Sequence, residues 1–424
     1  METLLTLLKV QNKQRELLDQ CEARPDVFIR YTYPKLLDES RAAVAKVLNA
    51  PIETVVYVPN ATSGVNTVLR NLVAHSDGKD DILYFSNIYG ACGKTVEYVC
   101  EASGDLFSKR LIPLTVPFED SDVIALFKQA IKESRSERKV PRVAVFDTIS
   151  SMPGFRVPFE QLTAICREEG ILSLVDGAHG IGQVPLDLTA LDPDFFISNC
   201  HKWLFVPRGC AVMFVAVRNQ HLIRSTLPTS HGYVPRPGTA KLAPNPLEEG
   251  INSPFINSFE FVGTIDNTNF LVIPEALKWR EQVCGGEAAI MNYNIKLAHE
   301  AGKLVADILG TKVVDNSTHT MTNCCLVNVL LPLTASTEKI EGTLTVHPDF
   351  GFPAVKWMQK TLVEEYGTFM AILFFQDQWL VRLSAQVYLE LEDFEWAGHK
   401  LKEICAKVTA QDKFQQIRTA GNRT

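Results

Sequence analysis

The chain has 424 residues, of which 46% are hydrophobic and 21% charged, and its formal net charge is −7. This length predicts two or three structural units, and the charge balance offers no basic surface for nucleic acid and no polybasic lipid anchor. No apolar run approaches the ~18–20 residues of a membrane span, and the start does not resemble a secretory signal. Ten cysteines without a C-x-x-C pair are typical of reduced core thiols in a cytoplasmic protein, and we expect no metal site.

Short apolar runs alternate with helical patterns through the first half of the chain. Strands are predicted at residues 55–58, 82–85, 143–146, 172–175, 195–198 and 211–217. Helices are predicted between several of them, at residues 63–74, 91–101, 122–133 and 159–169. Apolar strands alternating with helices favour an α/β fold with a mostly parallel, doubly wound sheet.

The pattern changes after residue 217. Residues 228–254 are rich in Pro and Gly and predict a long irregular segment, and residues 273–309 predict a long helix broken at Gly285 and Gly286. Later predictions are strands at 325–331, 343–346, 371–375 and 379–383, a helix at 394–408, and a fraying tail after Asp412. We therefore expect a large domain over 20–290, a smaller α+β domain over 291–424, and an N-terminal helix over 1–19 at a domain or dimer interface.

Polar residues that follow strands are the candidates for ligand binding, because ligands of open α/β sheets bind beyond the carboxyl ends of strands. After the first strand, Asn60, Ala61, Thr62 and Ser63 are small or polar residues that open a helix, where backbone N–H groups favour an anion. An ordinary N-cap is the alternative, and nucleotide-binding fingerprints are absent. After the second strand, Tyr89 can stack on a planar ring or simply pack in the core.

Two later strand ends carry more reactive side chains. Asp176 follows the strand at 172–175, with His179 close behind, so a carboxylate and an imidazole can meet a ring nitrogen and a ring oxygen. A turn aspartate with a satisfied histidine is the structural alternative. Lys202 follows the strand at 195–198, and a partly desolvated lysine has a lowered pKa and forms Schiff bases. A lysine that snorkels at a strand end is the alternative there.

Together these strand ends match the needs of one cofactor. The chain carries, in this order, a phosphate-binding turn, an aromatic residue, an aspartate and a lysine. Pyridoxal phosphate needs one group of each kind: the turn binds its phosphate, the aromatic stacks on its ring, the aspartate pairs with its ring nitrogen and the lysine amine bonds to its aldehyde. The sequence resembles the class V aminotransferase family, of the aspartate-aminotransferase fold type. Within the family it is most similar to a fungal group of isopenicillin N epimerase-like proteins and cysteine desulfhydrases that includes loline-alkaloid enzymes. Segments 59–72, 175–188, 199–209 and 259–266 carry the resemblance.

The resemblance implies a role for each cofactor contact. Ala61 and Thr62 would bind the phosphate of pyridoxal 5′-phosphate, and Tyr89 would stack on its ring. Asp176 would keep the ring nitrogen protonated, and His179 would face the ring hydroxyl.

The resemblance also implies the reacting and binding groups. Lys202 would form the internal aldimine, with Asn199 and His201 near the phosphate. Thr264 would reach the phosphate of a neighbouring subunit in a homodimer. Arg382 would clamp the carboxylate of an amino-acid substrate, although the residues alone favour a strand-edge position or an ion pair with Glu390 or Asp393.

Three functions follow as expectations. The first is an enzyme that acts at Cα of an amino acid through an external aldimine and a quinonoid, as transferase or lyase, in alkaloid-type secondary metabolism. The second is a cysteine desulfhydrase or C–S lyase. The third is a non-catalytic relative, because the Asn-His-Gly-Ser-like turn that relatives carry before the first helix is missing. Cys324 and Cys325 open a predicted strand, so a persulfide-forming role is not expected of them.

Overall fold

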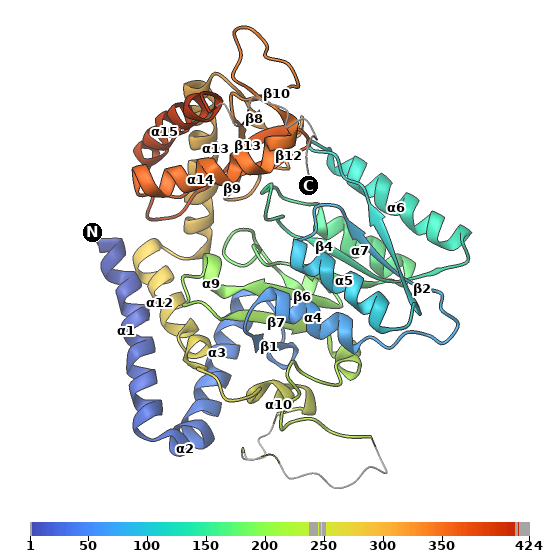
Figure 1. The fold of residues 1–424 in the computed structure, drawn as a ribbon. Helices are drawn as coiled ribbons and strands as arrows, with labels where there is room; N and C mark the ends of the chain where they lie inside the picture. Colours follow the sequence, from blue (N-terminus) through green and yellow to red (C-terminus); the bar gives the residue numbers. More distant parts are fainter. Residues whose placement is uncertain (1, 237–244, 246, 248–251, 412–413, 415–424) are drawn as a thin grey trace, which may run out of the picture. The chain divides into compact units, whose positions relative to one another are not determined.

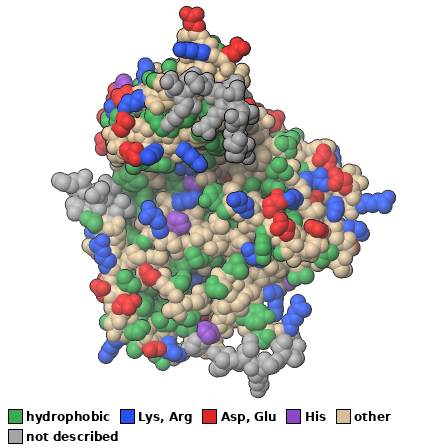
Figure 2. Space-filling model, in the orientation of Figure 1, with side chains coloured by type: hydrophobic (Ala, Val, Ile, Leu, Met, Phe, Trp, Pro, Cys, Tyr) green, Lys and Arg blue, Asp and Glu red, His purple; other side chains and the backbone are tan. Residues whose placement is uncertain are grey.

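The computed structural model describes residues 2–236, 245, 247, 252–411 and 414. Within this part of the chain, no helix is both long enough and apolar enough to cross a membrane. Much of the predicted irregular segment 228–254, and almost all of the tail after Asp412, lie outside the described residues. Figure 2 shows acidic and basic side chains scattered over one face of the molecule.

The chain divides into two compact units. The first contains Met1–Leu114, Asp120–Ile149 and Val157–Ile290, and the second contains Thr115–Glu119, Ser150–Arg156 and Met291–Thr424. The second unit therefore takes in two short segments from the first half of the sequence, which periodicity alone does not reveal.

The first unit holds a seven-stranded sheet and most of the helices (Figure 1). Its strands are β1 (Val55–Val58), β2 (Asp80–Phe85), β3 (Phe107–Ile112), β4 (Val140–Asp147), β5 (Leu172–Asp176), β6 (Phe195–Asn199) and β7 (Ala211–Val215). Its helices are α1 (Glu2–Ala23), α2 (Pro25–Val27), α3 (Tyr33–Val47), α4 (Ala61–Asn71), α5 (Gly90–Ala102), α6 (Asp120–Ser136), α7 (Phe159–Glu169), α8 (Leu188–Leu191), α9 (Cys200–Trp203), α10 (Pro254–Glu260), α11 (Thr268–Leu271) and α12 (Ile273–Cys284). Short turns are η1 (Phe28–Thr32), η2 (Ile52–Thr54) and η3 (Val217–Leu222).

The strand order of this sheet is β1-β7-β6-β5-β4-β2-β3. Only β7 runs antiparallel to its neighbours, β1 and β6, and the other pairings are parallel. The prediction of a mostly parallel, doubly wound α/β sheet is confirmed. Because six strands run the same way, their carboxyl ends lie along one edge of the sheet, and the polar residues that follow them are brought together there.

Helices cover both faces of the sheet because its strands are apolar on both sides. On one face, Val65 and Val68 of α4 and Val96 of α5 join Ile82 and Ile197 from the strands in one buried cluster. On the other face α6 packs on β3 and β4, and α7 packs on β4 and β5.

The first unit shows two elements that the sequence analysis missed and one feature that it predicted. The edge strand β3 was not predicted, because Lys109 and Arg110 interrupt its apolar pattern. Helix α3 was not predicted either. The predicted helix break is confirmed: Gly285 and Gly286 take positive φ angles of 79° and 90°, a region that favours glycine, and they end α12.

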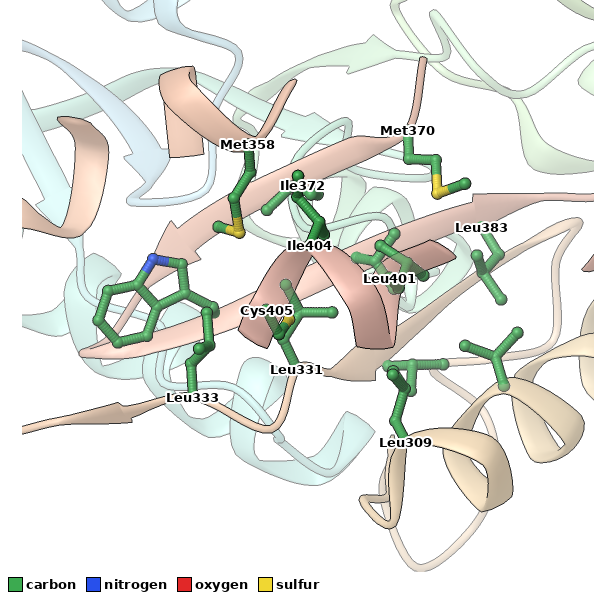
Figure 3. Packing of buried hydrophobic residues seen from close by; sticks show 14 of the residues in the cluster. Leu309, Leu331, Leu333, Met358, Met370, Ile372, Leu383, Leu401, Ile404 and Cys405 are labelled. Atoms are coloured by element: carbon green, nitrogen blue, oxygen red, sulfur yellow. The ribbon is translucent and has the colours of Figure 1, made fainter. Parts of the chain in front are cut away.

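The second unit is a four-stranded sheet of order β12-β13-β9-β8 with helices on one side. Its elements are α13 (Glu287–Leu309, with its first turn in the first unit), β8 (Val313–Val314), β9 (Leu326–Leu330), β10 (Thr334–Ala335), β11 (Thr345–Val346), η4 (Pro348–Phe350), α14 (Gly351–Tyr366), β12 (Ala371–Phe375), β13 (Gln378–Ser384) and α15 (Leu391–Thr409). Figure 3 shows Leu401, Ile404 and Cys405 of α15 packed beside Ile372 and Leu383 of the sheet. Helix α14 was not predicted from the sequence.

Candidate active site

Three neighbouring parallel strands of the first unit end in polar residues. Asp147 ends β4, Asp176 ends β5 and Asn199 ends β6, and each of these side chains is buried. Lys202 follows at once on the short helix α9. The sheet therefore brings residues from distant parts of the sequence to one edge.

The amine of Lys202 lies beside an imidazole. Its Nζ is 2.7 Å from Nε2 of His179, and Nε1 of Trp203 donates a hydrogen bond of 3.2 Å to Nδ1 of the same ring. An indole N–H can only donate, so Nδ1 is the acceptor and Nε2 carries the proton of the neutral ring. Nε2 then donates to Lys202, which must accept through the lone pair of an uncharged amine. This is the form in which lysine acts as a nucleophile and a base.

The helix that carries Lys202 is anchored from behind. Nη1 of Arg280 donates to the carbonyl oxygen of Trp203 over 2.7 Å, and the same guanidinium pairs with Glu287 over 2.5 and 2.6 Å. Gly182, at φ 80°, lies so close that a Cβ there would be 2.9 Å from the Trp203 oxygen. Close packing and a bidentate ion pair thus fix the end of α9.

The carboxylate of Asp176 is 2% exposed and is held by two donors. The Ala178 N–H donates to it over 3.0 Å and the Cys92 thiol over 3.5 Å. Burial raises the pKa of Asp176, and the hydrogen bonds from Ala178 and Cys92 oppose that rise. A buried carboxylate that forms no ion pair with a described lysine or arginine is suited to a cationic ligand.

Asp147, Asn87 and Cys92 are residues of this cluster that the sequence analysis missed. Asp147 is the register partner of Asp176, and Nδ2 of Asn87 donates to its Oδ2 over 3.0 Å. Burial, then the charge of Asp176, raises the pKa of Asp147 well above its ordinary value. The signal was present in the sequence, because Asp147 follows an apolar strand just as Asp176 does.

The start of α4 has the geometry of a capped helix. Oδ1 of Asn60 accepts the Ser63 N–H over 2.9 Å, and Oδ1 of Asn199 accepts the Ala61 N–H over 2.9 Å. Asn199 therefore reaches α4 across 138 positions of sequence. Among the described residues, the N–H and hydroxyl of Thr62 have no hydrogen-bond partner, so Thr62 is the group of this turn that remains available to an anion.

The remaining candidates of the first unit lie apart from these contacts. His201 turns towards β7, with Nδ1 2.7 Å from the Cys210 carbonyl oxygen, and burial lowers its pKa. Tyr89 precedes α5 and is half exposed, at 50%. Thr264 lies in an exposed run after Phe261.

Arg382 belongs to the second unit, where it lies on β13. Its Nη1 donates to the Ser151 carbonyl oxygen over 2.5 Å, its Nε is buried without a hydrogen-bond partner, and burial lowers its pKa. Glu390 and Asp393 cap α15 instead, with the Glu390 N–H donating to Asp393 over 2.9 Å. Within the described part of the chain no acid forms an ion pair with Arg382, so its positive charge is available to an anion.

A cavity of about 360 Å³ in the second unit is lined by Arg382, by several apolar side chains, and by the polar residues Thr368, Ser384 and Asp393. Phe369, Phe394 and Trp396 are among the apolar ones, and Phe369 is 64% exposed. A pocket with a largely apolar wall and a few charged or polar groups is the arrangement that orients a small ligand by one end.

The comparisons with known proteins agree with one another. The family model described as aminotransferase class-V matches residues 30–335. The chain is 38% identical to the L-cysteine desulfhydrase-like protein lolT1 of Epichloe uncinata, covering 96% of this chain and 92% of that protein. It is 30% identical to hercynylcysteine sulfoxide lyase of Schizosaccharomyces pombe, covering 94% and 91%. Among solved structures, the complex of the cystine C-S lyase C-DES with cysteine persulfide matches with a TM-score of 0.67 at 17% identity, covering 95% and 93%, which supports the fold.

Proposed function

The chain belongs to the class V aminotransferase family, whose cofactor is pyridoxal 5′-phosphate, and from this premise we propose that it is a lyase that cleaves the carbon–sulfur bond of a cysteine derivative. The family, the cofactor and the enzyme nature expected from the sequence are confirmed. The observation that carries the proposal is the position of the Lys202 amine, whose Nζ lies 2.7 Å from Nε2 of His179, near buried carboxyl groups.

The residues of the first unit fit this cofactor by their own chemistry. Asp147 and Asp176 are buried at adjacent strand ends without an ion pair to any described lysine or arginine, a setting that a cationic ring nitrogen neutralises. Thr62 offers an N–H and a hydroxyl at a helix N-terminus, which suits a phosphate. We assign the phosphate to Thr62, with Ala61, Asn199 and His201 shaping that end of the site, and the ring to Tyr89, Asp176 and His179.

When bound, pyridoxal phosphate supplies an electron-withdrawing ring that weakens bonds at the Cα of an attached amino acid. Lys202, as an amine, takes the Cα proton, and His179 holds the amine in position through Nε2. Asp176 would hold the proton on the ring nitrogen of the bound cofactor. Arg382 binds the substrate carboxylate, because its charge has no acidic partner among the described residues.

The cysteines of the chain support sulfur release from the substrate rather than transfer to an enzyme thiol. Burial raises the pKa of Cys324 to about 12, and Cys325 is fully buried. A buried thiol of raised pKa is a poor nucleophile. The two relatives reported above, whose names both refer to sulfur chemistry on cysteine compounds, support this choice.

A product assay with the holoenzyme tests the proposed reaction. Cysteine, S-alkylcysteines and their sulfoxides should give pyruvate and ammonia in equal amounts, with one sulfur product per turnover. A transaminase would instead move the amino group to an added 2-oxo acid and release no ammonia. Amino-group transfer without sulfur release would refute the lyase assignment and leave the cofactor assignment standing.

We also propose a homodimer in which Thr264 serves the phosphate of the neighbouring subunit. The run that carries Thr264 is exposed, which leaves Thr264 accessible to a neighbouring subunit. Sedimentation at micromolar concentration should show about twice the mass of one chain, and an active monomer would contradict this. A role in loline-type alkaloid metabolism and a cytoplasmic location stay predictions.

A further inference from the structure

Asp147 is a buried titratable residue that the proposed reaction does not use. It ends β4, is 6% exposed, and pairs in register with Asp176 at the end of β5. Directly opposed residues on neighbouring strands lie about 5 Å apart at Cα. The carboxyl groups of Asp147 and Asp176 are therefore buried side by side at the edge of the sheet.

The two carboxyl groups receive unequal support as anions. Asp176 accepts hydrogen bonds from the Ala178 N–H and the Cys92 thiol, and both bonds stabilise its ionised form. Asp147 accepts one, from the uncharged amide of Asn87. When two carboxylates share a site, the one with fewer donors retains a proton.

Few charged groups face this pair. Cys92 faces it from α5, and burial with the charge of Asp176 raises the pKa of that thiol, so it stays neutral. Lys202 lies near it on α9, where its Nζ is 2.7 Å from Nε2 of His179 in the loop after β5. One amine cannot balance two anions, and an uncharged amine balances neither.

We propose that Asp147 keeps its proton at neutral pH and acts as a positioning residue, so that the pair carries one negative charge and that charge resides on Asp176. Asp147 then fills the place beside Asp176 as a neutral acid, and the cofactor nitrogen meets a single anion. The protonation is a property of this chain, whereas its use in catalysis rests on the proposed role of Asp176.

Infrared spectroscopy of the holoenzyme detects the proton directly, because a neutral carboxylic acid has a C=O band that a carboxylate lacks and that shifts in D₂O. The wild type at pH 7 should show a band that Asp147→Asn removes. Asp81→Asn is the matched control, since Asp81 on β2 is also buried but is paired with Arg110 over 3.0 Å. That variant should leave the band in place. A band that survives in Asp147→Asn overturns the proposal, and Asp147→Ser replaces that variant if it does not fold.

Thermal melting of the holoenzyme from pH 5 to 9 gives the pH dependence of the melting temperature, which a change in packing alone does not alter. A carboxyl group whose pKa is raised by folding contributes stability below its unfolded pKa and loses that contribution as pH rises towards its folded pKa. The wild type should therefore lose stability relative to Asp147→Asn as pH rises, corresponding to one proton released on unfolding. If the difference in melting temperature between the wild type and Asp147→Asn does not change with pH, Asp147 is ionised in the folded protein and the proposal is overturned. Failure of the lyase assay alters neither result.

Discussion

Lys202 and Arg382 are the two basic residues to which we assign chemistry, and their surroundings differ in kind. Lys202 lies among groups that exchange protons, beside His179 and near Asp176. Arg382 is held by a carbonyl oxygen, and its buried Nε has no partner. A lysine amine can gain and lose a proton, whereas a guanidinium keeps its charge. We therefore propose that the first unit serves bond-making and proton transfer, and that the second recognises a permanent negative charge.

Of the substitutions that test this difference, Lys202→Ala should have the largest effect, on cofactor attachment and on turnover. Without the amine there is no covalent attachment of the cofactor, and loss of a general base alone slows turnover by about 10²–10⁴-fold. Borohydride reduction followed by mass spectrometry measures the attachment. Lys128→Ala, on the exposed side of α6, is the control and should keep both adduct and activity. A fixed adduct in Lys202→Ala would place the reactive amine elsewhere.

Arg382→Leu should weaken substrate binding next most strongly. Losing one partner of a charged hydrogen-bonded pair costs about 2–5 kcal/mol, or roughly 30- to 5,000-fold in the substrate dissociation constant. Titration with an amino acid and with its decarboxylated amine separates the causes, because the amine should bind both variants equally. If the melting temperature falls while amino-acid affinity is unchanged, Arg382 is structural.

Trp203→Phe should have a smaller effect that depends on pH. It removes the donor that fixes the His179 tautomer, so Nε2 can become an acceptor and Lys202 can hold its proton. Losing one such bond is worth about 0.5–1.5 kcal/mol, and cofactor attachment should slow and shift to higher pH. Stopped-flow absorbance after mixing with pyridoxal phosphate measures this.

Trp279→Phe is the control for Trp203→Phe, since the buried Nε1 of Trp279 has no hydrogen-bond partner in the described structure. It should leave the pH dependence of attachment as in the wild type. Equal shifts in the two variants would mean that the tautomer of His179 does not govern the charge of Lys202.

Cys324→Ala should have the smallest effect. Cys324 is the titratable side chain that acts on the charge of Arg382, and its raised pKa keeps it a neutral thiol. If the second unit only recognises substrate, sulfur release should proceed at nearly the wild-type rate. If Cys324→Ala abolishes sulfur release while amino-acid binding is intact, the second unit has a chemical role, and the proposed difference between the two units is wrong.

The sequence was informative where a local pattern carries the chemistry. Asp176 and Lys202 follow apolar strands, so their shared edge of the sheet could be predicted from periodicity. Asp147 has the same position after its strand but lacks the small residues and histidine that drew attention to Asp176. Strand β3 was missed because, as an edge strand, it carries charged side chains.

Contacts that join distant residues could not be predicted in this way. Asn199 meets Ala61 across 138 positions, and Arg382 meets Ser151 across 231. The hydrogen bond from Trp203 that selects the His179 tautomer depends on how α9 turns after β6. These facts depend on tertiary packing, which pattern and propensity do not encode.

The two asparagines at the start of α4 have a consequence for the cost of binding. Asn60 and Asn199 already hold the N–H groups of Ser63 and Ala61, so the turn that presents Thr62 is ordered by the protein itself. The loss of chain entropy needed to shape this turn occurs during folding and not when an anion arrives. An anion that binds there meets a rigid receptor, and more of its interaction energy remains as affinity.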